Sequence, residues 1–397
     1  RTDEALLRRE VVLREGDVDS LEALRETRIG IQGLRIFRSV IVRPRPEDAE
    51  AGPDGEVIWP VEILAGERPP RSVRLGAGWG TDDRFRAQLG YEHRNWLGHA
   101  RHLDTRLRYS RLERSFLAGL EQPHWLSRRQ TLRLETRLGQ DLTPAYDAER
   151  LVGGLRVSCR IGTHWSAQAG YELSWTAISD VGGAGNRLLD DPEQRVFLSG
   201  LRLGVRRSTI ENPLDARQGS RVDLSVAPFP RALGSDVGFL ATELNARAFQ
   251  PLGPTVVLAG RLRLDSLQPF GGDSADAIPM PERFYAGGGS SVRGFSFWRL
   301  GPREADGRAV GGASVLEGSV ELRFPIRGPV GGVVFADAGQ LDLSPWGWKP
   351  ADLSYSVGGG LRIDTPLGPI RLDLAVPIDP PDEAGTTWFH FSIGQAF

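Results

Sequence analysis

The chain is poor in cysteine, in lysine and in long apolar runs, and the first and last of these shortages each exclude a class of protein. Cys159 is the only cysteine in 397 residues, so no disulfide can form within the chain. No apolar run approaches the roughly 18–20 residues that a membrane-spanning helix needs. The net charge of -2 at pH 7 gives no indication of a nucleic-acid partner. Lys349 is the only lysine, and we interpret the preference for arginine as a codon-usage bias.

The usual signatures of catalysis and cofactor binding are also missing. There is no G-x-S-x-G elbow of a hydrolase, and the glycines at 287–289 are not followed by the Lys-Ser/Thr of a phosphate loop. His93, His99 and His102 gather near a turn, and we interpret them as surface histidines rather than metal ligands. We therefore predict a protein that is not an enzyme, with no cofactor and no metal site.

Residues 1–67 predict a small α+β domain. Helix starts are indicated at Thr2, which acidic residues follow, and at Asp19, which has a glutamate three residues later. Two strand-like runs come next, at 36–42 and 57–63. Because two strands alone make a marginal sheet, this order of elements does not complete a stable sheet by itself.

From Ser72 onward the apolar residues recur with a period of two. Val73, Leu75 and Ala77 alternate with arginine and glycine, and later runs behave in the same way. The polar phase is rich in arginine, which suits the wet lumen of a barrel whose apolar phase faces lipid. Closure into a barrel also satisfies every backbone group, as lipid requires. About sixteen such runs occur, an even number as bacterial barrels have. Their predicted first residues are 72, 82, 101, 113, 129, 149, 164, 194, 218, 237, 254, 312, 330, 353, 367 and 387.

This pattern predicts a mostly β protein, with residues 68–397 forming a 16-stranded antiparallel transmembrane β-barrel. One long connection, residues 270–311, interrupts the series of strands, and we call it the lid loop. A soluble β-protein is the competing interpretation, and it would be extracted without detergent.

Three motifs give the barrel a family resemblance. The lid loop contains Val292-Arg293-Gly294-Phe295 after its glycines, a later strand contains Phe335-Ala336-Asp337-Ala338-Gly339, and Glu321 stands in the strand before it. These motifs resemble the BamA/TamA superfamily of outer-membrane assembly proteins. Leu300-Gly301-Pro302 and the modest lid length resemble its TamA-type members.

The resemblance implies a set of site residues. In the family the lid folds back into the barrel, and its arginine contacts acids of two strands. Carried over to this chain, the lid lock consists of Arg293, Gly294, Phe295, Glu321 and Asp337. Alternation places both acids on the inward phase. A guanidinium in a partly desolvated lumen needs the bidentate geometry that a carboxylate offers.

The resemblance also predicts a lateral gate between the first and last strands. The final run ends on an aromatic residue and resembles the C-terminal signal of barrel precursors, and glycine near the end weakens strand pairing. The predicted gate residues come from both strands: Val73, Leu75, Ala77, Phe391, Ile393, Gly394 and Phe397.

The implied function is a protein insertase or translocation pore in the outer membrane of a Gram-negative bacterium. It would assist unfolded β-barrel or autotransporter precursors in the lipid bilayer. Residues 1–67 resemble a POTRA domain without its first strand, so we expect further POTRA domains before Arg1, on the periplasmic side, and a TamB-like partner. The alternatives are a two-partner secretion transporter with one dedicated substrate, and a passive porin-like channel.

Overall fold

The computed structural model describes residues 2–13, 16–17, 20–51, 57–179, 194–212, 215–363, 365, 370–378 and 388–393. The chain packs as two compact units. The first comprises residues 1–74, 90–106 and 118–135, and the second comprises residues 75–89, 107–117 and 136–397. Among the helices that the structure describes, none is long and apolar enough to cross a membrane.

The N-terminal residues form two helices and a two-stranded sheet. Helices α1 (Glu4–Glu10) and α2 (Leu21–Gly33) precede β1 (Phe37–Pro44), which pairs antiparallel with β4 (Val61–Glu67). A 3-10 turn, η1 (Pro46–Asp48), and a short ribbon of β2 (Glu50–Ala51) and β3 (Val57–Ile58) lie between them in sequence. The helices bury one apolar face, whose fully covered side chains include Ile31 and Leu34.

Three details of this region differ from the prediction. The cap of α1 is Asp3 rather than Thr2, because the Asp3 carboxylate accepts from the Ala5 N–H at 3.0 Å. The cap of α2 is Ser20, whereas Asp19 lies outside the described residues. The predicted strand at 57–63 is divided into β3 and β4, and Pro60, which has no N–H to donate to a ladder, stands between them.

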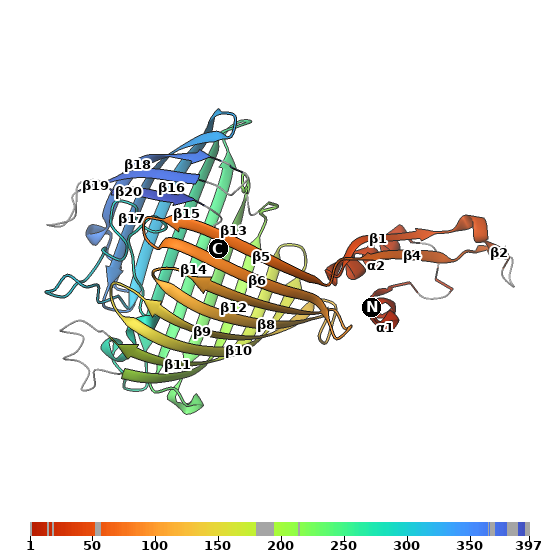
Figure 1. Cartoon of the computed structure of the whole chain (residues 1–397), viewed down its shortest axis with the longest axis horizontal. Helices are drawn as coiled ribbons and strands as arrows, with labels where there is room; N and C mark the ends of the chain where they lie inside the picture. Colours follow the sequence, from red (N-terminus) through yellow and green to blue (C-terminus); the bar gives the residue numbers. More distant parts are fainter. Residues whose placement is uncertain are drawn as a thin grey trace. The chain divides into compact units, whose positions relative to one another are not determined.

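The prediction of a 16-stranded barrel is confirmed. Strands β5 to β20 form one closed sheet in which each strand neighbours the next and β20 returns to β5 (Figure 1). The strands are β5 (Arg71–Gly80), β6 (Arg84–Trp96), β7 (Arg101–Tyr109), β8 (Glu113–Pro123), β9 (Gln130–Leu142), β10 (Asp147–Ile161), β11 (Trp165–Ser179), β12 (Gln194–Ser208), β13 (Gly219–Phe229), β14 (Phe239–Pro251), β15 (Val257–Pro269), β16 (Ser314–Arg327), β17 (Val330–Asp342), β18 (Ser354–Ile363), β19 (Ile370–Ile378) and β20 (Trp388–Ile393). Every predicted start lies within three residues of the observed one, and the largest differences are at β15 and β19.

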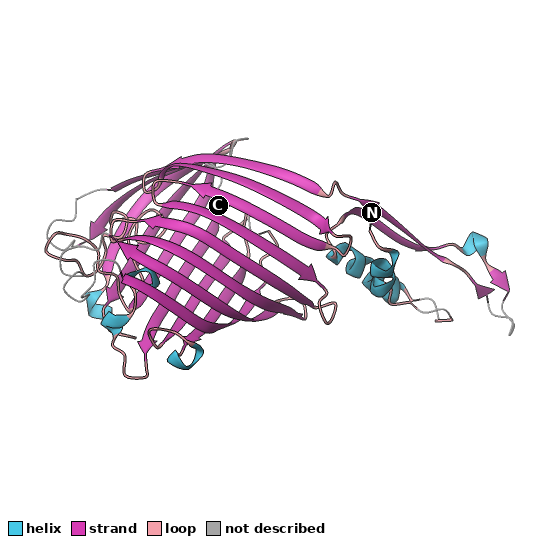
Figure 2. Cartoon of the chain, turned by 60° about the horizontal axis from the view of Figure 1, so that its bottom comes forward, coloured by secondary structure: helices cyan, strands magenta, loops and turns pink. Residues whose placement is uncertain are grey.

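Within the described residues, the connections between barrel strands contain four 3-10 turns: η3 (Arg231–Leu233), η4 (Ala275–Ala277), η5 (Met280–Glu282) and η6 (Pro350–Asp352). In Figure 2 the wall of the barrel consists of strands, and the short helical turns lie among the loops. The long connection between β15 and β16 therefore corresponds to the predicted lid loop, with its end two residues later than predicted.

The wall has one apolar and one charged face, as the alternation indicates. On β9, Leu134 and Leu138 are 47% and 48% exposed. On the opposite phase of the same strand, Arg133 lies 2.9 Å from Asp104 of β7. Apolar side chains therefore cover the outside, and ion pairs occupy the inside, of the closed sheet.

The largest apolar cluster joins the lid loop to the wall. Phe229, Phe239 and Leu267, on β13, β14 and β15, are almost completely buried, as are Val292 and Phe295 of the lid loop. Burying apolar side chains stabilises a folded arrangement by about 25 cal/mol per Å² removed from water. The lid loop is thus a packed part of the second unit.

Candidate functional site

A turn that contains glycines precedes Arg293 in the lid loop. Gly287 and Gly288 have φ values of 100° and 106°, a region that side-chain-bearing residues rarely adopt. The Gly288 N–H donates to the Phe295 carbonyl at 2.9 Å, which closes the turn around Arg293. The Gly287 N–H donates to Ser291 Oγ at 2.8 Å, so the turn is also held by a side chain.

Arg293 is buried, with 3% of its surface exposed, and its guanidinium is bound by two carboxylates. Nε donates to Asp337 Oδ2 at 2.7 Å and Nη2 donates to Asp337 Oδ1 at 2.6 Å, a two-pronged contact that lysine cannot make. Nη1 donates to Glu321 Oε1 at 2.7 Å. The structure therefore brings Arg293, Glu321 and Asp337 together, on the inward phase where alternation placed both acids.

Three further side chains complete the environment of Arg293, and the sequence prediction did not include them in this role. The guanidinium carbon lies 3.4 Å from the centre of the Phe335 ring, within the range of a cation–π contact. Ser319 Oγ accepts from Nη2 at 3.1 Å, and a carboxylate oxygen of Asp373 lies 3.8 Å from Nη1. Asp373 lies on the inward phase of β19. Alternation could have placed its side chain inside the barrel, but no motif marks it as a partner of Arg293.

The carboxylates around Arg293 are shared with other arginines. Arg323 lies 2.7 Å from Glu321, and Arg362 lies 2.5 Å from Asp373. Sharing keeps the cluster close to charge balance, which a buried group requires.

The small residues of the motifs are explained by close packing. A Cβ on Gly294 would lie 2.4 Å from Ser356 Cβ, and a Cβ on Gly339 would lie 2.6 Å from Val292 Cγ2. The Gly294 N–H also donates to Ser356 Oγ at 3.1 Å. In the pattern Phe335-x-Asp337-x-Gly339, the ring therefore stacks on the guanidinium, the carboxylate binds it, and the glycine admits the neighbouring valine.

The lid loop also contacts both strands of the β5–β20 seam, and the sequence prediction missed this. On β20, the Nε2 atom of His390 lies 2.8 Å from the carbonyl oxygen of Arg293. The Gly289 N–H donates at 3.1 Å to Asp82, in the turn after β5. The loop is thus bound to the first hairpin and to the last strand at once.

The predicted gate residues are distributed unevenly along this seam. The described ladder between β5 and β20 has two residue pairs, Trp79 with Ile393 and Gly80 with Ser392, and Phe391 packs against the Trp79 ring at 5.4 Å. Val73, Leu75 and Ala77 precede the described ladder on β5, and the first two are 63% and 82% exposed. The remaining predicted residues, Gly394 and Phe397, lie outside the described residues.

The interpretation of the three histidines needs one correction. His102 is 9% exposed, and its Nε2 lies 3.1 Å from the Leu34 carbonyl oxygen. It is therefore a packed residue of the first unit rather than a surface residue, because it falls on the inward phase of β7.

A closed barrel with an apolar exterior, a charged interior and a lid loop bound inside by carboxylates is the fold of an outer-membrane β-barrel protein. The chain belongs to the Omp85 superfamily, whose domain model matches residues 95–397. It is therefore a bacterial outer-membrane protein of this family.

Curated and solved relatives agree with this assignment. The chain is 24% identical to the outer membrane protein assembly factor BamA of Neorickettsia risticii over 389 residues, covering 94% of this chain and 50% of that protein. It is 23% identical to BamA of Nitratidesulfovibrio vulgaris, covering 100% of this chain and 50% of that protein. The crystal structure of Haemophilus ducreyi BamA lacking POTRA domains 1-3 has a TM-score of 0.84 at 18% identity, covering 100% of this chain and 82% of that one. This chain spans about half the length of these curated relatives.

Proposed function

We propose that the protein assembles other β-barrel proteins into the outer membrane by pairing their strands at the β5–β20 seam. The observation that carries the proposal is that the lid loop contacts both sides of this seam, through His390 of β20 and through Asp82 in the turn after β5. A strand edge that is freed at such a seam is a template on which an incoming strand can pair.

The lid loop supports a controlled opening of that seam. Its contacts with His390 and Asp82 lie on both sides of the seam, so release of the loop would remove a bridge between β20 and the first hairpin. The contacts of Arg293 with Glu321 and Asp337 bind the same loop to β16 and β17. In this proposal the five predicted lid-lock residues hold the closed state.

The finer assignments belong to the same proposal. Residues 1–67 would form the last POTRA domain, with 68–397 as the barrel, and the helix–helix–strand–strand order of that segment supports this division. Leu300-Gly301-Pro302 supports the TamA type, which would use the POTRA side in the periplasm to bind a TamB-like partner. Unfolded barrel or autotransporter precursors would be the substrates.

The experiment closes the seam with a disulfide. Trp79 and Ile393 face each other in the ladder, and directly opposed residues of an antiparallel pair have Cβ atoms about 4.5–5.5 Å apart, close enough for a disulfide after a small adjustment. The variant is Trp79→Cys/Ile393→Cys in a Cys159→Ser background. The whole chain is placed in liposomes, and the rate at which a urea-denatured porin folds into them is measured before and after reduction.

Oxidation should abolish the acceleration of porin folding, and reduction should restore it. The matched control is Ala246→Cys/Leu262→Cys, an opposed pair between β14 and β15, whose oxidation should change nothing. Full acceleration by the oxidised Trp79/Ile393 variant would refute the seam mechanism. Steady ion conductance without any effect on folding would instead favour the channel or the dedicated transporter.

A further inference from the structure

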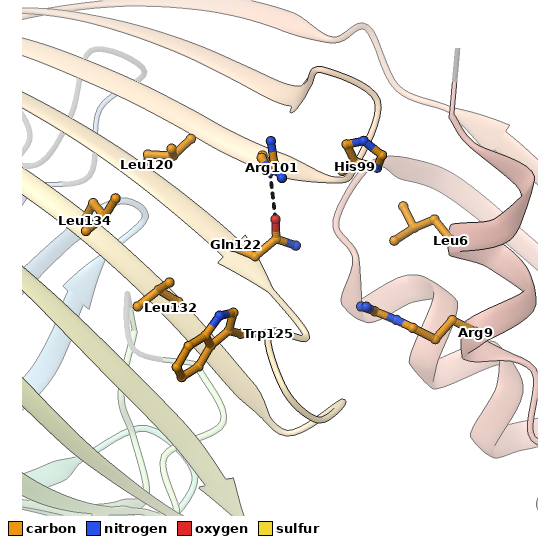
Figure 3. Close-up of a pocket in the computed structure, with 9 residues that line it drawn as sticks. All are labelled: Leu6, Arg9, His99, Arg101, Leu120, Gln122, Trp125, Leu132 and Leu134. Atoms are coloured by element: carbon orange, nitrogen blue, oxygen red, sulfur yellow. Dashed lines mark hydrogen bonds between the residues drawn. The ribbon is translucent and has the colours of Figure 1, made fainter.

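The first compact unit contains a groove of about 470 Å³ between α1 and strands β7 to β9. Figure 3 shows Leu6 and Arg9 of α1 pointing toward those strands. None of the described lining residues is acidic. The groove is lined by two guanidiniums, those of Arg9 and Arg101, and by the apolar side chains of Leu120, Trp125, Leu132 and Leu134.

The groove opens on the outer face of the wall. Arg101 shares its phase on β7 with Leu107 and Tyr109, which are 49% and 53% exposed, whereas Asp104 on the other phase faces inward and pairs with Arg133. Arg101 Nε donates a hydrogen bond of 2.8 Å to Oε1 of Gln122, which is a neutral amide. No ion pair joins Arg101 to a carboxylate of the residues that the structure describes, so this arginine among leucines brings a positive charge to the outer face.

The second arginine of the groove is held in place by the turn between β8 and β9. Arg9 Nη2 donates to the His124 carbonyl at 3.0 Å, and Arg128 donates to the Arg9 carbonyl at 2.7 Å. The next residue, Glu10, is fully buried, and its carboxylate lies 2.6 Å from His124 Nδ1 and 3.5 Å from both Arg9 Nε and Arg128 Nε, so it offsets part of the positive charge beside the groove. These contacts fix the end of α1, so Arg9 is positioned at the groove before any ligand arrives.

We propose that the groove binds an anionic phospholipid, with its phosphate on Arg9 and Arg101 and an acyl chain along Leu120, Leu132 and Leu134. The outer face of a membrane barrel contacts hydrocarbon, so leucines there already favour acyl chains. A guanidinium offers a phosphate two parallel N–H donors, and indole rings prefer the boundary between hydrocarbon and head groups, where Trp125 would lie. This site is independent of the seam, so either proposal can fail alone.

The test is native mass spectrometry of the whole chain in detergent, titrated with palmitoyl-oleoyl phosphatidylglycerol or with phosphatidylcholine of the same chains. Arg9→Gln and Arg101→Gln should each lower the apparent affinity for phosphatidylglycerol about fivefold, because each loses one charge near the phosphate. The loss for phosphatidylcholine should be smaller, because its choline ammonium already offsets the phosphate charge. The matched control is Arg114→Gln, on the same outer phase as Gln122 at the opposite end of β8, which should alter neither lipid. Heat-modifiable gel migration confirms that each variant is folded.

Two results would overturn the role of the two arginines. One is an unchanged preference for phosphatidylglycerol in the Arg9→Gln/Arg101→Gln variant, and the other is an equal loss in Arg114→Gln, which would indicate general surface charge. Leu134→Gln tests the apolar side with both guanidiniums in place, and it should weaken both lipids. Displacement of phosphatidylglycerol by an equal concentration of glycerol phosphate would likewise contradict the acyl contact.

Discussion

Replacing Arg293 by alanine should release the lid loop while the barrel stays folded. The guanidinium donates three hydrogen bonds of 2.6 to 2.7 Å to Asp337 and Glu321, and the Asp337 side chain is 0% exposed. Removing one partner of a buried ion pair costs about 3–5 kcal/mol, because the other charge stays buried without compensation. Even 3 kcal/mol raises the open population of the loop roughly a hundredfold.

Proteolysis after Phe295 measures that population. Phe295 is 1% exposed, so chymotrypsin reaches it only when the loop opens. When closing is fast relative to cleavage, the cleavage rate follows the open population. Arg293→Ala should therefore be cut after Phe295 about a hundred times faster than wild type. Arg293→Lys keeps the charge without the two-pronged contact, and its rate should fall between the two.

A surface arginine provides the control for this prediction. Arg231 also contacts one carboxylate through two nitrogens, at 2.9 and 2.6 Å to Asp273, but 55% of its side chain is exposed. Exposed pairs contribute about 0–1 kcal/mol, so Arg231→Ala should leave cleavage after Phe295 unchanged. A wild-type rate in Arg293→Ala would refute the argument that the buried ion pair holds the loop.

Two further predictions concern packing and pH. Gly294→Ala places a Cβ 2.4 Å from Ser356 Cβ and should loosen the loop in the same protease assay, whereas Gly260→Ala, with open space around its Cβ, should not; equal rates for the two variants would contradict the steric argument. The hydrogen bond from Arg231 is the main reason that the pKa of Asp273 is lowered to about 2. Because the folded pKa is depressed, the stability from this carboxylate is present above about pH 4 and lost as the pH falls toward 2. Denaturant titrations of wild type and Asp273→Asn should therefore differ at pH 5 and converge at pH 2, and a constant difference would exclude this linkage.

The sequence alone determined the barrel and most of its strand positions. Alternation with a period of two is a local property, because each side chain of a strand faces one of only two sides. In lipid the outer face must be apolar along every strand, so the pattern persists over the whole wall. Arg293, Glu321 and Asp337 were also foreseeable, because short motifs marked them and alternation placed the two acids on the inner face.

Only the tertiary structure decided what else surrounds Arg293. Asp373 is far from the lid loop in sequence, and its 3.8 Å approach to the guanidinium depends on how the closed sheet brings β19 near β16 and β17. The same holds for His390 and Asp82, whose contacts with the lid loop join residues about 100 and 200 positions apart. Periodicity assigns a side chain to a face but does not say which residue lies opposite it. The register of the strands and the path of the loop decide that, and they result from packing over the whole barrel.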